Sequence, residues 1–303
     1  MAAAPTEVAN DLAFPEGPIA FPDGSLLFVE LGRGAISRIT ALGQLERVAT
    51  PGGSPNGAAM GPDGCCYVCN SGGWRWVREH GLLQPRFDAP DYSGGRIERV
   101  NLSTGHVDRV YETVNGQSLI RPNDIVFDRT GGFWFTDLGT NEARVYRQGG
   151  LYYARADGSS ITEVAFPLMT PNGVGLSPDE RTVYVAESIT GRLLAFDLAA
   201  PGTLAPATGL GKAIGAAPGF GYFDSLAVDA SGTVNVATVL HSGITAIDPR
   251  TSATHMPWRS EDPFTTNICF GGKDLRTAFI TLSGTGRIVS MPWPVAGLKL
   301  NFL

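Results

Sequence analysis

The segment from Asn123 to Asp137 reads NDIVFDRTGGFWFTD: a polar residue, a short apolar run, a turn rich in Asp, Thr and Gly, and a returning aromatic run. Two apolar runs joined by such a turn are typical of a β-hairpin. Five other segments share the pattern: EGPIAFPDGSLLFVE from Glu16, NGAAMGPDGCCYVCN from Asn56, NGVGLSPDERTVYVAE from Asn172, DSLAVDASGTVNVAT from Asp224 and NICFGGKDLRTAFIT from Asn267. The chain therefore contains one hairpin repeated six times.

The repeat predicts an all-β fold, a six-bladed β-propeller with four-stranded blades, formed by residues 1–303 as a single domain. A further strand-like stretch follows most hairpins, as from Gly34 to Thr40 and from Gly286 to Met291. The last repeat has too few residues for a full blade, so we expect residues 7–14 to supply its outer strand and close the ring. A two-sheet sandwich is the alternative, but it gives no reason for a period of roughly fifty residues.

Composition excludes several classes of protein. The 303 residues include 39 Gly and 21 Pro, which disfavours long helical bundles, and 43% hydrophobic against 17% charged residues indicates a folded globular protein. The net charge of −6, without a basic cluster, argues against nucleic acid as a partner. No signal-peptide pattern or long apolar run occurs, so we expect a cytoplasmic protein without a membrane partner. The oligomeric state is left open.

The opening residues of the six repeats are the candidate site. Equivalent positions in a ring of blades lie on a circle around its axis, so these residues should meet at one mouth of the channel. All six end in a carboxylate or amide oxygen: Glu16, Asn56, Asn123, Asn172, Asp224 and Asn267. Turn chemistry is the alternative explanation for each one alone, and for Asn56 and Asn267 a purely structural role remains open. The hairpins' last residues should join the same rim: Glu30, Asn70, Asp137 and Glu187.

An oxygen-rich rim of this kind favours a divalent metal ion. Glu16 and Asp224 bring two negative charges, and Asn123 and Asn172 bring amide oxygens. Hard cations prefer such ligands, so Ca²⁺ is the first expectation, with Zn²⁺, Mn²⁺, Fe²⁺ and Mg²⁺ as alternatives. About four protein ligands would leave positions open for water or substrate, as catalysis requires.

Several ordered motifs resemble the regucalcin, gluconolactonase and luciferin-regenerating-enzyme family, from about Phe14 to the final blade. They are Phe14-Pro-Glu16-Gly-Pro, Arg121-Pro-Asn123-Asp124, Pro171-Asn172-Gly173, Phe223-Asp224-Ser225-Leu-Ala-Val-Asp and Thr266-Asn-Ile-Cys269-Phe-Gly-Gly. The resemblance implies a six-bladed propeller with a divalent metal at the channel mouth and metal-dependent lactone hydrolysis, or hydrolysis of other esters or organophosphates.

The resemblance also implies roles for individual residues. Glu16, Asn172 and Asp224 would be metal ligands, Asn123 would contact the metal or its substrate, and Arg121 would contact the substrate. The pair Asp224-Ser225, rather than Asp-Gly, is similar to the staphylococcal drug-responsive lactonases. The reaction class is thus better supported than a sugar-lactone substrate.

Lactone opening explains why such a site would be catalytic. A metal ion polarises the ring carbonyl, and a neighbouring carboxylate takes a proton from the attacking water. We expect Asp224 to be that carboxylate, although bound metal makes it a weaker base; Asp124 and a water activated by the ion are the alternatives. A non-catalytic propeller that binds a ligand at the same mouth is the competing function.

Two further substrate contacts are predicted outside the metal set. His241 follows the fifth hairpin closely and should lie near the rim, with an ordinary loop histidine as the alternative. Trp74 belongs to an aromatic-rich insertion, residues 72–94, that starts just after Asn70. We expect this insertion to overhang the mouth and wall a pocket for a small-molecule lactone, the alternative being packing against neighbouring blades.

Overall fold

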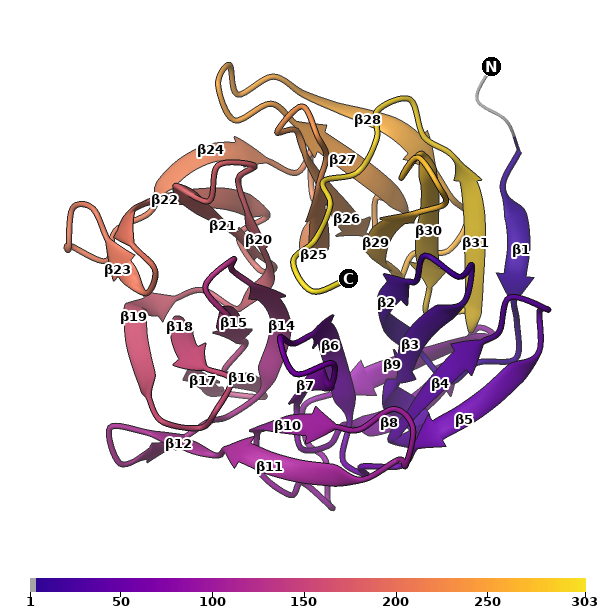
Figure 1. Cartoon of the computed structure of the whole chain (residues 1–303), viewed down its shortest axis with the longest axis horizontal. Coiled ribbons are helices and arrows are strands. Elements are labelled where there is room, and N and C mark those ends of the chain that lie inside the picture. The colour runs from indigo at the N-terminus through magenta and orange to yellow at the C-terminus, as the bar shows by residue number, and fades with distance from the viewer. Residues whose placement is uncertain (1–3) are drawn as a thin grey trace.

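The computed structural model describes residues 4–303, and within them six sheets surround a central channel (Figure 1). The chain runs around the ring blade by blade, and each blade starts with its innermost strand. The only helical element of residues 4–303 is the short 3₁₀ turn η1 (Leu31–Arg33). None of the helical structure in that range is long and apolar enough to cross a membrane.

Five of the blades follow the predicted order of inner hairpin, third strand and outer strand. Blade 1 consists of β2 (Pro15–Ala20), β3 (Leu26–Glu30), β4 (Ala35–Ile39) and β5 (Leu45–Ala49). Blade 2 consists of β6 (Pro55–Met60), β7 (Cys66–Asn70), β10 (Arg96–Val100) and β11 (Val107–Tyr111). Blade 3 consists of β14 (Pro122–Phe127), β15 (Gly132–Asp137), β18 (Gly149–Arg155) and β19 (Ile161–Leu168). Blade 4 consists of β20 (Pro171–Leu176), β21 (Thr182–Glu187), β22 (Arg192–Ala200) and β24 (Lys212–Ala216), with β23 (Thr203–Leu204) beside the far end of β22. Blade 5 consists of β25 (Tyr222–Val228), β26 (Val234–Val239), β27 (Gly243–Ile247) and β28 (Thr254–Arg259).

The sixth blade is completed by the N-terminal strand. Its strands β29 (Thr265–Gly271), β30 (Thr277–Leu282) and β31 (Arg287–Pro292) are followed by β1 (Thr6–Ala9), which pairs antiparallel with β31. Figure 1 shows β1 at the outer edge of the ring beside β31. This confirms the predicted closure of the ring, which also removes a free edge from the last sheet.

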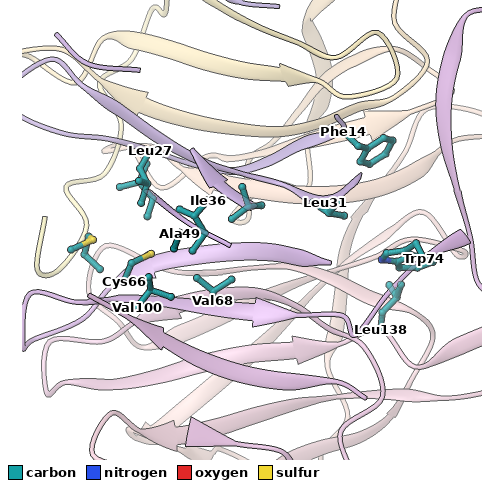
Figure 2. Packing of buried hydrophobic residues seen from close by; sticks show 13 residues of the cluster. Phe14, Leu27, Leu31, Ile36, Ala49, Cys66, Val68, Trp74, Val100 and Leu138 are labelled. Atoms are coloured by element: carbon teal, nitrogen blue, oxygen red, sulfur yellow. The ribbon is translucent and has the colours of Figure 1, made fainter. Parts of the chain in front are cut away.

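Apolar side chains hold neighbouring blades together. Between blades 1 and 2, Leu27, Ile36, Cys66 and Val68 are fully buried in one cluster. In Figure 2 these four lie deep between the sheets, while Trp74 lies at the other end of the same cluster. Each strand presents alternate residues to either face, so both faces of a blade bury apolar side chains against a neighbour. The apolar cluster between blades 1 and 2 therefore reaches from the sheets to Trp74 in the insertion.

The pairing register of most inner hairpins separates the opening residue from the last residue. In four blades a proline pairs with the last residue of its hairpin: Pro15 with Glu30, Pro55 with Asn70, Pro122 with Asp137 and Pro171 with Glu187. In these four blades the opening residue follows the proline directly. In all six inner strands the pairing register between the first two strands shifts at or next to the opening residue. Successive side chains of a strand point to opposite faces. In the four blades with the proline, the opening residue therefore points to the other face than the hairpin's last residue, which is paired with the proline.

Glycines let the inner strands approach one another around the axis. A Cβ on Gly17 would lie 2.5 Å from the carbonyl oxygen of Asn56, and a Cβ on Gly57 would lie 2.5 Å from that of Asn123. Each of these glycines follows an opening residue and meets the opening residue of the next blade. A larger side chain would push the blades apart at the height of the candidate site.

Short hairpins extend from the ring. The insertion between blades 2 and 3 forms β8 (Arg75–Glu79) and β9 (Leu82–Arg86), and Leu83 N donates to Gly284 O in blade 6 over 2.9 Å. Two smaller hairpins are β12 (Thr113–Val114) with β13 (Gln117–Ser118) and β16 (Thr140–Glu142) with β17 (Val145–Arg147).

The C-terminal segment returns to the channel, and Figure 1 shows that it ends near the centre of the ring. Leu298 N donates to Val228 O over 3.0 Å, and Asn301 Nδ2 donates to Phe127 O over 3.1 Å. Both acceptors lie at the ends of inner strands that are farthest from the opening residues. The segment therefore covers the end of the channel opposite the candidate site.

Candidate metal centre and pocket

The four predicted metal ligands line one pocket of about 290 Å³. Asn123, Asn172 and Asp224 come from the second or third residue of β14, β20 and β25, and Glu16 is the second residue of β2. Glu16, Asn123 and Asn172 are buried, and Asp224 is partly exposed. These four side chains, together with Asn56, supply the polar floor of the pocket.

Two amide oxygens of this floor have no hydrogen-bond donor. Within residues 4–303, Asn123 Oδ1 and Asn172 Oδ1 are buried and make no hydrogen bond. Asn172 Nδ2 donates to Ser188 Oγ over 3.1 Å, which leaves the amide oxygen as the free atom. A buried acceptor without a partner is costly, and a cation held between these oxygens and two carboxylates would satisfy both. The residues present therefore fit a hard divalent ion.

The charge of the floor fits the same ion. Burial raises the pKa of Glu16, and burial together with the neighbouring Glu16 carboxylate raises the pKa of Asp224 well above its usual value. Two carboxylates in one buried site oppose each other's ionisation, and a dication would reverse that effect. In the part of the chain that the structure describes, no three His, Cys, Asp or Glu side chains gather as a metal site. The predicted set does not require such a group, because half of its ligands are amides.

Neighbouring groups fix the orientation of Glu16. Its Oε2 accepts hydrogen bonds from Gly17 N over 2.9 Å and from Asn267 Nδ2 over 2.6 Å. Asn267 Oδ1 in turn accepts from Ile268 N over 2.8 Å. Both ends of the Asn267 amide are thus engaged, so Asn267 positions Glu16.

Asp124 lies below the floor. It lines a second cavity of about 260 Å³ inside the channel, whose far wall is formed by residues 298–301 of the C-terminal segment. Its Oδ1 accepts from Ile125 N over 2.9 Å and its Oδ2 from Val174 N over 3.2 Å. Burial and, to a smaller extent, the Glu16 carboxylate raise the pKa of Asp124 to about 7.

The last residues of the hairpins do not line the pocket, contrary to expectation. Their oxygens accept backbone N–H groups from the loops: Glu30 from Ala13, Asn70 from Ser54, Asp137 from Arg121 and Glu187 from Met169. All four are buried. Each of these residues pairs with the proline that comes just before the opening residue. Their side chains therefore lie on the face of that proline and not on the face of the opening residue.

The insertion does overhang the pocket, as predicted. Trp74, Pro85 and Phe87 line the pocket, and the rings of Trp74 and Phe87 lie 4.7 Å apart. Trp76 contacts Phe14 at 5.2 Å between ring centroids. The hairpin β8–β9 therefore forms one wall of the pocket.

Arg121 lies behind that wall rather than on it. Its guanidinium carbon lies 4.7 Å from the ring centroids of Trp74 and Tyr92 and 5.4 Å from that of Phe87. Arg121 Nη2 donates to Phe87 O and lies 3.7 Å from Glu142 Oε1. The side chain is 2% exposed and faces a groove between blades 2 and 3. Its contacts are those of an anchor for the hairpin.

His241 also lies apart from the pocket lining. Its ring packs under the Gly219–Gly221 loop, where a Cβ on Gly221 would lie 2.6 Å from His241 Cδ2. His241 Nε2 is buried and has no hydrogen-bond partner among residues 4–303. The glycines of this loop indicate a turn in the sequence, but its packing over His241 depends on tertiary contacts that no local pattern records.

The pocket walls contain residues that the sequence argument missed. Leu31, Leu138, Ser188 and Val239 each follow the last residue of a hairpin directly, and all four line the pocket. Their equivalent place in the repeat is the signal that would have found them. Phe14, Phe223 and Phe264 complete the apolar wall.

The fold and the floor define a class of protein: a six-bladed propeller with an oxygen-lined site at one mouth of its channel. Residues 14–284 match the family described as SMP-30/Gluconolactonase/LRE-like region, and the chain belongs to that family. This confirms the resemblance seen in the sequence motifs.

Curated relatives match part of the chain. A stretch of 85 residues, 28% of this chain and 26% of the relative, is 45% identical to the lactonase drp35 of Staphylococcus saprophyticus. A longer stretch of 202 residues, 60% of this chain and 51% of the relative, is 25% identical to the gluconolactonase of Zymomonas mobilis. The matched stretches thus span about a quarter and about half of these relatives.

Solved structures share the architecture. The calcium-binding protein regucalcin from Agrobacterium tumefaciens has a TM-score of 0.75 at 19% identity, covering 99% of this chain and 96% of that chain. A gluconolactonase from Xanthomonas campestris has a TM-score of 0.72 at 21% identity, covering 95% and 89%. At such identities the likeness concerns the fold.

Proposed function

We propose that the protein is a metal-dependent lactonase that opens a small lactone ring with water. The observation that carries the proposal is the pair of orphaned amide oxygens, Asn123 Oδ1 and Asn172 Oδ1, in the same pocket as the carboxylates of Glu16 and Asp224. Family membership and the lactonase relatives support the reaction class. The calcium-binding regucalcin neighbour supports Ca²⁺ as the first metal to test.

Four residues would hold the ion: Glu16, Asn123, Asn172 and Asp224. When bound, a divalent cation supplies Lewis-acid polarisation of an ester carbonyl. Asn267 would keep Glu16 Oε2 engaged and so leave Glu16 Oε1 for the ion. Ser188 would hold Asn172 with its oxygen toward the pocket.

Asp224 is the candidate for moving the proton. It is the partly exposed carboxylate of the floor, so water and substrate can reach it. In ring opening, Asp224 would accept a proton from the attacking water, and the leaving ring oxygen would regain a proton as the hydroxy acid forms. Asp124 would contribute a buried charge from below, because two backbone N–H groups occupy its oxygens and it lies in the channel cavity.

The remaining predicted contacts take different roles in this proposal. Trp74 would contact the substrate as part of the wall. Arg121 would act as a positioning residue that fixes Trp74 and Phe87, and His241 would support the loop above it.

A substrate panel tests the proposal. Purified protein, with its metal content measured, is assayed by acid release on γ- and δ-lactones, aryl esters and an organophosphate triester. We expect lactones to be hydrolysed fastest and Asp224→Asn to lower the activity at least about a hundredfold. Preference for an aryl ester or the triester would assign a different hydrolase. Absence of turnover together with metal binding would indicate a non-catalytic propeller.

A further inference from the structure

The walls of the pocket differ in chemistry from its floor. Above the carboxylates and amides, the wall is built from Leu31, Leu138, Val239 and the aromatic rings of Phe14, Phe223 and Phe264. Trp74 and Phe87 close it from the side of the hairpin. A substrate that reaches the floor therefore buries its substituents against hydrocarbon.

Two hydroxyl groups of the wall, those of Thr170 and Ser188, are engaged within the protein. Thr170 Oγ1 donates to Met169 O over 2.7 Å and accepts from Ile189 N over 2.9 Å. Ser188 Oγ accepts from Asn172. Trp74 Nε1 is buried without a partner in the described part of the chain, and Asn141 and Tyr222 are the other polar side chains of the lining above the floor. The wall therefore offers a substrate few donors and acceptors. The hydroxyls of a sugar lactone need several donors and acceptors, and each buried hydroxyl left unpaired weakens binding by about five- to a hundredfold.

The charges of the pocket argue against an anionic substrate. Of residues 4–303, no Lys, Arg or His lines the pocket, and its charged side chains are Glu16 and Asp224. The guanidinium of Arg121, behind the hairpin wall, is enclosed by Trp74, Phe87 and Tyr92. A substrate carrying a phosphate or carboxylate would therefore find no cationic side chain in the lining, and the two floor carboxylates would already balance the charge of a bound dication.

The apolar surface continues outward to the rim. Ile189 and Tyr222 line the pocket, and Ile189 is 43% exposed. The ring of Phe220, 75% exposed, lies 5.4 Å from that of Tyr222. This strip of side chains leads from the pocket to solvent and can cover a substituent longer than the pocket itself.

From these features we infer that the substrate is a lactone with a hydrocarbon substituent, alkyl or aryl, rather than a polyhydroxylated or anionic lactone. The inference rests on the proposed lactonase function, which it narrows. The floor would receive the ester group, and the wall and rim would receive the substituent. A pocket of about 290 Å³, near the lower end of the ~300–1,000 Å³ range for small-molecule sites, suits one ring with a short chain.

Matched lactones test the inference by activity. The δ-lactones with methyl, propyl and pentyl substituents share one ring and differ only in chain length, and glucono-δ-lactone carries hydroxyls on the same ring. We expect kcat/KM to rise about fourfold for each methylene that enters the wall, and glucono-δ-lactone to be the poorest substrate. A higher kcat/KM for glucono-δ-lactone than for the pentyl lactone would overturn the inference and leave the proposed function intact. Turnover of none of them would instead count against the function.

Binding of lactams gives a readout that does not depend on turnover. The lactam analogues of the pentyl lactone and of glucono-δ-lactone are titrated into metal-free and metal-loaded protein and followed by calorimetry. We expect the pentyl lactam to bind at least tenfold more tightly in both states. Equal or reversed affinities would contradict the assignment of the substrate class.

Two variants test whether the wall contacts the substituent without disturbing the folding of the protein. Val239→Thr keeps the shape of the side chain and adds a hydroxyl, and Ile189→Asn alters a residue on the exposed rim, where folding is not at risk. Both should lower kcat/KM for the pentyl lactone about fivefold or more and lower it less for the methyl lactone. Leu42→Thr, 86% exposed and outside the pocket lining, is the matched control and should change neither value. Equal losses on both lactones would show that the substituent does not contact this wall.

Discussion

Asn267 Nδ2 donates a hydrogen bond to Glu16 Oε2 over 2.6 Å, and so links the inner strand of the last blade to that of the first. The bond lies beside the floor of the pocket and fixes one oxygen of a proposed metal ligand. Ring closure and the candidate metal site are therefore coupled through this side-chain contact. A substitution at Asn267 in the last blade should therefore change the affinity of the site for a metal ion.

Replacing Asn267 by Leu tests this coupling. The variant leaves Glu16 Oε2 without its side-chain donor, and hydrogen bonds to charged groups contribute about 1.5–3 kcal/mol. We expect the affinity for Ca²⁺, measured by calorimetry, to fall at least tenfold. Asn10→Ala, which removes an exposed Asn–Glu hydrogen bond at the N-terminal strand, is the control and should bind normally. Unchanged affinity in Asn267→Leu would show that Glu16 is held in other ways.

Asp224→Asn should separate catalysis from stability. The substitution removes one of the two floor charges and the proposed proton acceptor, so we expect turnover to fall by at least about a hundredfold. Because burial and Glu16 oppose the ionisation of Asp224, the neutral amide should leave the metal-free protein as stable as the parent, or more stable. Thermal unfolding and single-turnover assays measure both. Near-normal turnover with metal bound would exclude Asp224 as the proton acceptor and make Asp124 the next residue to test.

The sequence predicted the blades and the floor well because both repeat. Glu16, Asn123, Asn172 and Asp224 occupy one place in a repeated hairpin, so the closed ring brings them together. The face of Glu30 and its equivalents was predicted wrongly, because each pairs with the proline one position before the opening residue, and a one-residue difference in hairpin register puts a side chain on the opposite face.

Features outside the repeat were harder to predict. Arg121 precedes an opening residue by two positions, and nothing near it indicates that Trp74, Phe87 and Tyr92 enclose its guanidinium. Those rings come from the insertion, whose path depends on tertiary contacts such as Leu83 N with Gly284 O. Aromatic residues in the insertion were predicted to wall the pocket, but the cation behind them was expected to contact the substrate.

Arg121→Met tests the role of Arg121 as an anchor. Loss of the guanidinium removes the stacking with Trp74 and Tyr92 and the hydrogen bond to Phe87 O. We expect KM for an alkyl lactone to rise several-fold with a smaller change in kcat, and the insertion to become sensitive to limited proteolysis. Arg121→Lys keeps the charge without the planar fork and should recover only part of both effects. A large fall in kcat with an intact, protease-resistant insertion would instead support direct contact with the substrate.

The stability of metal-free protein should depend on pH. Burial raises the pKa values of Glu16 and Asp224, and it raises that of Asp124 to about 7. Unfolded carboxyls titrate near pH ~4, so the folded state keeps protons that the unfolded state has released. The free energy of unfolding of metal-free protein should therefore fall as the pH rises from about 4 through about 7.

Bound metal should cancel that loss, because a dication favours the ionised carboxylates. We expect the gap in Tm between metal-loaded and chelated protein to widen from about pH 5 to about pH 8. Scanning calorimetry at several pH values measures the gap. A gap that is constant across this range would mean that the floor carboxylates do not bind the ion.

Removal and return of the metal is the most direct test of the proposed lactonase. Protein is stripped with a chelator, its residual metal is measured by elemental analysis, and lactone hydrolysis is followed while Ca²⁺, Mn²⁺, Zn²⁺ or Mg²⁺ is added back. The account predicts one tightly bound ion per chain, loss of hydrolysis on removal with the β-rich circular dichroism spectrum retained, and recovery of activity at one equivalent. Full lactone hydrolysis by protein shown to contain no metal would contradict it.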